Sequence, residues 1–80
     1  MKVQVLLFAR YAEAAGAPVV AVEVEEGTTL AEVWASIRAH CPGLEGVARP
    51  LMAADRAYAT PDTKIVPGME VAFFPPVSGG

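Results

Sequence analysis

The sequence contains little of what sites for nucleic acid, disulfides or zinc need. Its 80 residues include six Lys and Arg against nine Asp and Glu, for a net charge of −3. Binding to nucleic acid depends on clustered cations that neutralise phosphates, so this scattered, acidic balance argues against it. The single cysteine, Cys41, excludes an internal disulfide and a zinc site built on several thiolates. We therefore expect no metal and no bound cofactor.

Long apolar runs are also missing. The N-terminal segment MKVQVLLFAR has one lysine and an apolar run too short for a signal peptide or a membrane-spanning helix. We therefore expect a cytoplasmic protein that forms a single domain over residues 1–80. The apolar fraction is nevertheless 54%, which is high for a chain with so small an interior. Part of the apolar surface is thus available for a partner protein.

The first quarter of the chain predicts two strands with a short helical turn between them. Residues 2–8 alternate with apolar side chains on both faces, which is typical of a strand in the middle of a sheet. Residues 9–17 favour a short helical turn that ends at Gly16. Residues 19–25 alternate between valines and mostly polar residues, so this strand has one buried and one solvated face.

One amphipathic helix follows. Thr29 and Glu32 form the capping-box pattern, with a threonine at the N-cap and a glutamate three residues later. Pro42 and Gly43 end the helix near His40. Its apolar face repeats at helical spacing through Leu30, Val33, Trp34 and Ile37.

The second half predicts short strands. Residues 44–63 are the least regular part, with possible strands at 51–53 and 57–59 joined by a turn. Pro67 and Gly68 then form a turn before a last strand over residues 70–74. A sheet with one helix across one face is the economical way to bury a single amphipathic helix. We therefore predict an α+β fold of the β-grasp, or ubiquitin-like, type, with a mixed sheet whose first and last strands lie in the middle.

The C-terminal end differs in composition from the rest. Pro75 and Pro76 cannot donate to a ladder, so the last strand must stop there, and they favour an extended exit of the chain. We expect residues 75–80 to form a flexible tail, because four residues beyond the prolines span about 13 Å when extended. The part that would thread into a tight active site is Val77, Ser78, Gly79 and Gly80. A frayed terminus without function is the alternative.

The carboxylate of Gly80 is the candidate reactive group. With a pKa of about 3.5, a free α-carboxylate is anionic and a poor electrophile at neutral pH. Adenylation by ATP would convert it into a mixed anhydride, and a sulfur nucleophile would then displace AMP to leave a thiocarboxylate. The preceding Gly79 has no Cβ to obstruct a close approach of the backbone to phosphates. In contrast, His40 at a helix end and the adjacent Cys41 point about 100° apart, which disfavours a catalytic pair.

Aromatic residues are predicted on the sheet face away from the helix. If Val3, Val5 and Leu7 face the helix, then Phe8 points to the opposite side. The same parity places Phe74 there. Leu6, Ala72 and Tyr58 join them, which predicts an exposed aromatic patch beside the tail. Such a patch suits the anchors of a protein interface. The alternative is that the short middle strands or the segment 9–17 cover the patch.

Residues 70–80, EVAFFPPVSGG, closely resemble the C-terminal signature of the MoaD family, the small sulfur-carrying subunits of molybdopterin synthase. The opening VLLFA of residues 5–9, the length and the order of elements are also similar to that family. Two departures lie at Gly68-Met69, where an acid more often follows the glycine, and near Ala54-Asp55, where the family usually has Asn.

The resemblance implies a sulfur-transfer cycle. An E1-like, MoeB-like enzyme would adenylate Gly80 with ATP, and a persulfide-bearing donor protein would supply sulfur for the thiocarboxylate. The charged tail would then enter the large synthase subunit, MoaE, and give sulfur to cyclic pyranopterin monophosphate. MoaE would hold the catalytic side chains, and two such heterodimers would join as a heterotetramer. The implied partner interface is Phe8, Tyr58, Phe74, Pro75 and Pro76.

Three alternatives remain from sequence alone. The first is a carrier that serves tRNA thiolation or thiamin synthesis. The second is a ubiquitin-like modifier that is attached to lysines through Gly80. The third is an interaction domain with an inert tail. The Phe-Phe-Pro-Pro-Val run counts against the first, because related carriers share the terminal Gly-Gly but usually lack that run.

Overall fold

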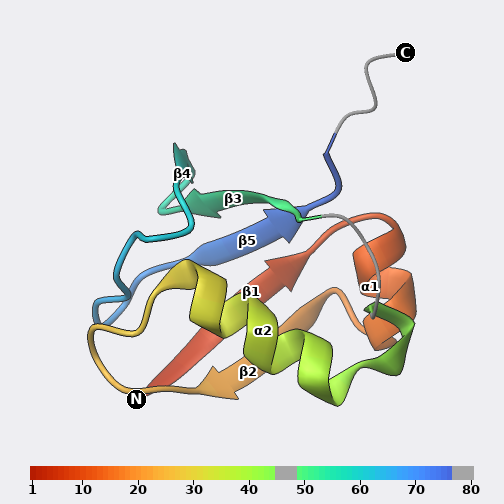
Figure 1. Ribbon diagram of the computed structural model, residues 1–80, viewed down its shortest axis with the longest axis horizontal. Helices are drawn as coiled ribbons and strands as arrows, with labels where there is room; N and C mark the ends of the chain where they lie inside the picture. The colour runs from red at the N-terminus through yellow and green to blue at the C-terminus, as the bar shows by residue number, and fades with distance from the viewer. Residues whose placement is uncertain (45–48, 77–80) are drawn as a thin grey trace.

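The computed structural model describes residues 1–44 and 49–76 and has the predicted α+β, β-grasp arrangement (Figure 1). Five strands form one sheet in the order β2-β1-β5-β3-β4. Their bounds are β1 Lys2–Leu7, β2 Val19–Glu23, β3 Leu51–Ala54, β4 Ala57–Ala59 and β5 Val71–Phe74. The helices are α1 Arg10–Ala15, α2 Leu30–His40 and the 3₁₀ turn η1 Pro42–Leu44. Among the described residues, no helix is long and apolar enough to span a membrane.

The first and last strands are neighbours in the middle of the sheet, as their two apolar faces predict. β1 and β5 run parallel, with Leu6 opposite Ala72 and Leu7 opposite Phe73. The other three pairings are antiparallel. β1 and β2 are joined by α1, which ends at Gly16 in the left-handed conformation that glycine favours.

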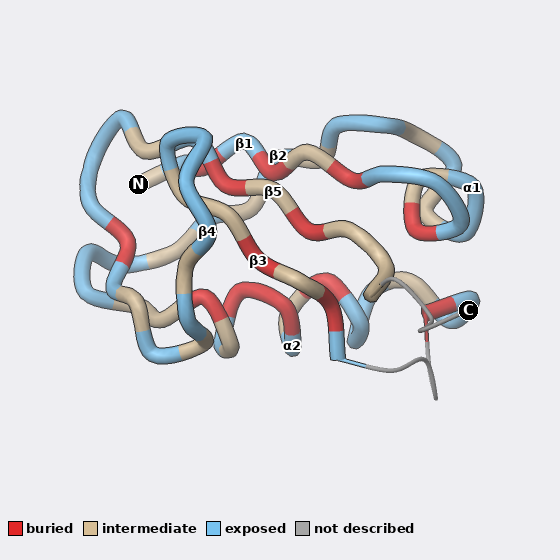
Figure 2. Tube along the Cα trace, turned by 90° about the horizontal axis from the view of Figure 1, so that it is seen from above, coloured by how far each residue is buried: buried red, intermediate tan, exposed pale blue. Residues whose placement is uncertain are grey.

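Helix α2 covers one face of the sheet, and the core lies between them. Figure 2 shows buried positions along β1, β5, β3 and α2, with exposed ones concentrated in the loops and in β4. The aromatic centre of this core is a chain of three rings. Trp34 lies 5.0 Å from Tyr11 and 5.2 Å from Phe73 between ring centroids. The buried hydrophobic residues are Val3, Val5, Leu7, Tyr11, Leu30, Val33, Trp34, Ile37, Leu44, Met52, Ile65, Val71 and Phe73.

Three strands are shorter than the sequence predicts. The first ends at Leu7, one residue early, because the chain turns at Ala9 with a φ of 53°. The second ends at Glu23, before the predicted Glu25, and the turn over residues 26–27 follows. The last begins at Val71, because Glu70 still belongs to the approach from the turn at Gly68. The hairpin of β3 and β4, predicted around Asp55 and Arg56, is confirmed.

Candidate functional site

One row of side chains crosses the sheet on the face opposite α2. Leu6 in β1 lies opposite Ala72 in β5, and Ala72 lies opposite Ala53 in β3. Ala53 in turn lies opposite Tyr58 in β4. Strand alternation explains this placement, because the flanking Val5 and Leu7 are buried against the helix. The two alanines have short side chains, so the middle of the row is low and its ends are bulky.

Three aromatic rings gather at this row: those of Phe8 and Phe74 beside it and that of Tyr58 at its end. The ring of Phe74 lies 5.9 Å from that of Phe8, edge to face, and 5.9 Å from that of Tyr58. Phe8 is 48% exposed and Tyr58 is 80% exposed. Neither the hairpin nor the segment 9–17 covers the rings, so the exposed aromatic patch predicted from strand parity is confirmed. Its role as a partner interface stays a prediction.

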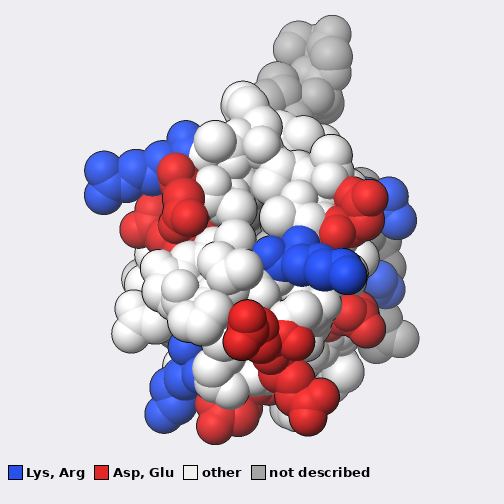
Figure 3. Space-filling view, turned by 90° about the vertical axis from the view of Figure 1, so that its left-hand side faces the viewer, with Lys and Arg blue, Asp and Glu red and all other residues white. Residues whose placement is uncertain are grey.

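The rings and the row enclose an open groove of about 630 Å³, which we call the aromatic groove. It is lined by Leu6, Phe8, Ala9, Ala53, Arg56, Tyr58, Glu70, Ala72, Phe74 and Pro75. Eight of these ten residues carry apolar or aromatic side chains, and the two charged ones have opposite signs. The groove is therefore a neutral, mostly apolar surface on an acidic protein. Figure 3 shows charged groups of both signs across one side of the molecule and an uncharged area in the upper part of that view.

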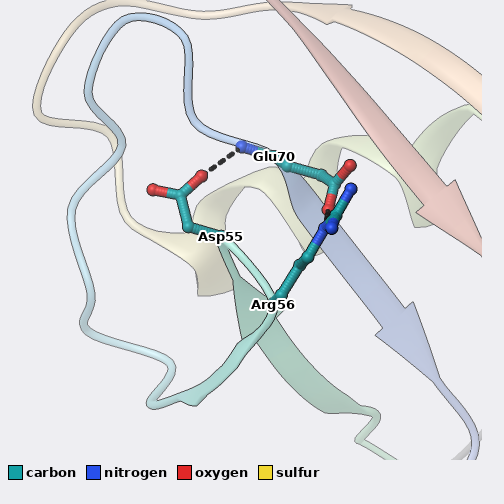
Figure 4. A network of polar contacts seen from close by, with 3 residues as sticks. All are labelled: Asp55, Arg56 and Glu70. Atoms are coloured by element: carbon teal, nitrogen blue, oxygen red, sulfur yellow. Dashed lines mark hydrogen bonds and ion pairs between the residues drawn. The ribbon is translucent and has the colours of Figure 1, made fainter.

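A polar network joins the β3–β4 turn to the residue before β5 (Figure 4), and two of its members, Arg56 and Glu70, line the groove. The Asp55 carboxylate accepts the backbone N–H of Glu70 at 2.9 Å, and the Asp55 N–H donates to the Glu70 carbonyl at 2.8 Å. Arg56 Nε lies 3.5 Å from a carboxylate oxygen of Glu70. The turn between β3 and β4 is thus tied to the start of β5, which carries Phe74.

The described chain leaves the sheet beside the groove. Pro75 follows the last residue of β5 and lines the groove, whereas Pro76 is half-buried and does not line it. The predicted threading and reactive residues, Val77, Ser78, Gly79 and Gly80, lie outside the described residues. β5 therefore directs the chain toward its C-terminal end from the edge of the aromatic groove.

Sequence reasoning found the three aromatic residues and Pro75 but missed the polar end. Glu70 shares the parity of Ala72 and Phe74, a signal that was sufficient to place it on this face. Arg56 reaches the groove only because of the register of the β3–β4 turn, which periodicity does not supply. His40, predicted as a surface residue, is exposed, and its Nδ1 donates to the Ser36 carbonyl at 2.8 Å. In the part of the chain that is described, no three metal-ligating side chains come together.

Comparisons with known proteins agree with this fold and length. A family model described as the ThiS family matches residues 5–80. A molybdopterin synthase sulfur carrier subunit of Chlamydomonas reinhardtii is 35% identical over 83 residues, covering all of both chains. A protein of the same name from Homo sapiens is 32% identical and covers 99% of this chain and 94% of its own length.

Solved structures have the same architecture. SAMP1 from Haloferax volcanii superposes with a TM-score of 0.85 at 28% identity, with all of both chains covered. A putative molybdopterin converting factor, subunit 1, from Pyrococcus furiosus gives 0.85 at 26% identity, covering 96% of this chain and 99% of that one. A complex of subunits 1 and 2 of molybdopterin-converting factor from Helicobacter pylori gives 0.66 at 22% identity, with complete coverage, which shows the fold alone.

Proposed function

The chain belongs to the ThiS family, and from this premise we propose that it is the sulfur carrier subunit of a molybdopterin synthase. The observation that carries the proposal is the similarity to two sulfur carrier subunits at 35% and 32% identity over nearly the whole chain. These relatives also confirm the resemblance to the MoaD family drawn from residues 70–80. The aromatic groove supports the proposal, because it would give the carrier an apolar docking surface at the point where β5 ends.

In this function the reactive group is the Gly80 carboxylate. An E1-like enzyme would join it to AMP and release pyrophosphate from ATP. The terminal sulfur of a protein persulfide would then displace AMP, and a second thiol would cleave the resulting S–S bond to release the thiocarboxylate. Sulfur transfer to cyclic pyranopterin monophosphate would return the carboxylate.

The partner in the last step would be a MoaE-like large subunit that supplies the catalytic side chains. The Helicobacter pylori complex of subunits 1 and 2 supports such a pairing for a protein of this fold. Phe8, Tyr58 and Phe74 are the candidate anchors, since aromatic side chains are enriched in the cores of protein interfaces and tyrosine is enriched among the residues that dominate binding energy. Two such heterodimers joined through their large subunits would form the heterotetramer.

Intact mass spectrometry tests the chemistry. We expect the chain, after incubation with the activating enzyme, ATP and a persulfide donor, to gain the mass difference of one oxygen replaced by sulfur. A variant that lacks Gly79 and Gly80 is the control and should gain nothing. An unchanged mass in the presence of an enzyme that charges another carrier would refute the proposal.

A second candidate is a ubiquitin-like modifier, favoured by the likeness to small archaeal modifier protein 1 at a TM-score of 0.85. It would use the same adenylate but pass Gly80 to a lysine amine. Branched Gly-Gly remnants on lysines of many cellular proteins would favour this candidate. Copurification separates the remaining alternative, because a carrier for tRNA thiolation or thiamin synthesis would capture enzymes of those pathways in place of a MoaE-like subunit.

A further inference from the structure

The turn that follows Phe8 has a backbone conformation that suits glycine but contains none. The Tyr11 N–H donates to the Phe8 carbonyl at 3.1 Å, which closes a four-residue turn. Its first central residue is Ala9, with φ 53° and ψ −130°. These angles are those of the first central position of a type II′ turn, where glycine is strongly preferred because a Cβ is disfavoured there.

The turn between β3 and β4 repeats this feature. Ala54 and Ala57 are paired across it, and the two residues between them are Asp55 and Arg56. Their φ angles are 51° and 69°. Positive φ at both central positions defines a type I′ hairpin turn, in which the second position is usually glycine. Arg56 therefore occupies a strained conformation.

Both strained turns border the aromatic groove. Among the described residues, Ala9, Asp55 and Arg56 are the non-glycine residues with positive φ, and Ala9 and Arg56 line the groove. The glycines with positive φ lie elsewhere, at Gly16, Gly27 and Gly68, and a Cβ added to any of them would meet nothing within 4 Å. At these three glycines the positive φ, and not crowding, disfavours a side chain. The described residues that carry a side chain at positive φ all belong to the two turns that border the groove.

The two most exposed aromatic residues of the groove are attached to these turns. Phe8 directly precedes Ala9, and its N–H donates to the Phe73 carbonyl at 3.3 Å. Tyr58 lies two residues after Arg56. An exposed aromatic anchor that is ordered only on binding loses conformational entropy, so a backbone fixed in advance lowers the cost of association.

We propose that Ala9 and the Asp55-Arg56 pair are positioning residues. Their strained turns hold Phe8 and Tyr58 at the two sides of the aromatic groove in the orientation that a MoaE-like large subunit binds. This role rests on the proposed function for the identity of the partner. Glycine at these positions would relieve the strain but would also widen the range of φ and ψ that each turn can visit.

The first test is Ala9→Gly. We expect its melting temperature to equal or exceed that of the wild type, because glycine relieves the positive φ. We expect the dissociation constant for purified MoaE-like large subunit to rise about fivefold. A rise of this size corresponds to the entropic cost of ordering one aromatic side chain on binding. The control Ala35→Gly lies on the exposed face of α2. It should lower the melting temperature by about 4–8 °C and leave the dissociation constant unchanged.

A second pair of variants isolates the hairpin turn. Arg56→Gly and Arg56→Asn both remove the ion pair with Glu70, but asparagine adopts the left-handed conformation more readily than most residues and is stiffer than glycine. We expect the glycine variant to bind about threefold more weakly than the asparagine variant. Equal binding of the two would show that the hairpin backbone does not position Tyr58.

Amide order parameters of the free chain separate this inference from the proposed function. The N–H of Phe8 should have an order parameter of about 0.85 in the wild type and a clearly lower value in Ala9→Gly. Equal order in the two, a lower melting temperature of Ala9→Gly, or unchanged binding would each overturn the positioning role. If the wild type fails to bind the large subunit while the order parameters differ as expected, the proposed function fails and the positioning by Ala9 stands.

Discussion

Two adjacent phenylalanines in β5 serve opposite faces of the sheet. Phe73 is fully buried and packs against Trp34, with 5.2 Å between ring centroids. Phe74 points to the other face and contacts Phe8. Strand alternation alone assigns these two environments, so this part of the site was predictable from parity.

The two residues should therefore respond differently to the same truncation. Phe73→Ala removes a buried ring and should lower the free energy of unfolding by about 3–5 kcal/mol. Phe74→Ala should cost less than about 1.5 kcal/mol, because its ring is only half-buried. Urea unfolding of both variants measures the difference. A larger loss for Phe74→Ala would contradict the assignment of faces.

Tyr58 allows binding and stability to be separated. Its side chain is 80% exposed, so Tyr58→Ala should change the free energy of unfolding by less than about 0.5 kcal/mol. Its affinity for the large subunit should fall by about 2 kcal/mol, which is about 30-fold, if the ring is an interface anchor. Val66→Ala, at another exposed apolar residue outside the groove, is the matched control. Calorimetric titration that gives equal affinities for both variants would count against the groove as the docking surface.

At the scale of elements, α2 was the best predicted part of the fold. Its N-cap is Thr29, whose hydroxyl accepts the Glu32 N–H at 3.2 Å. The Glu32 carboxylate accepts the Thr29 N–H at 2.9 Å. Both partners of each bond lie within the same four-residue motif, so the motif predicts the bonds without any knowledge of the tertiary structure.

The capping box gives α2 a pH-dependent N-terminus. Hydrogen bonds from the backbone N–H and then the hydroxyl of Thr29 lower the pKa of Glu32 below its ordinary value of 4.5. A carboxyl group whose pKa is lower in the folded state stabilises that state above its unfolded pKa. This contribution is lost as the pH falls through the lower folded value.

The substitution Glu32→Gln tests this dependence, because glutamine keeps an acceptor oxygen but does not titrate. We expect wild type to gain stability relative to the variant at pH values above 4.5 and to lose this gain as the pH falls further. Urea midpoints measured between neutral and acidic pH follow the difference. A difference independent of pH would mean that the carboxylate does not contribute through its charge.

The β3–β4 hairpin and its polar network were harder to predict. The strands have four and three residues, too few for a clear periodic signal. The bonds of Asp55 and Arg56 to Glu70 connect residues 14 or 15 positions apart. Such contacts depend on the register of β3 against β5, which is decided by tertiary packing. The groove's aromatic members were therefore found from sequence. Parity was also sufficient to place Glu70 on their face, but its pairing with Asp55 and Arg56 required the structure.

For the molecule as a whole, the buried core accounts for stability, whereas the proposed chemistry depends on the C-terminal glycines. Every buried hydrophobic residue of the described chain lies between Val3 and Phe73. Gly79 and Gly80, on which the proposed chemistry depends, lie outside the described residues. The central place of the first and last strands was predictable, because these two segments are apolar on both faces and both must lie inside the sheet.

This division predicts the effect of removing the last two residues. A chain without Gly79 and Gly80 should melt within about 2 °C of the full chain, because it keeps every buried residue from Val3 to Phe73. It should still bind the large subunit through the groove but support no synthesis of molybdopterin. Thermal unfolding, calorimetric titration and a reconstituted synthase assay measure the three properties. Retained synthesis would favour an interaction domain with an inert tail.

The central position of β5 has a consequence for biosynthesis. This strand is translated after all the others, yet it pairs with both β1 and β3 and supplies Ala72, Phe74 and the start of the exit toward the tail. A nascent chain that has not yet released β5 from the ribosome can form neither the middle of the sheet nor the floor of the groove. We therefore expect a product truncated before β5 to lack the floor of the groove and not to occupy the partner unproductively.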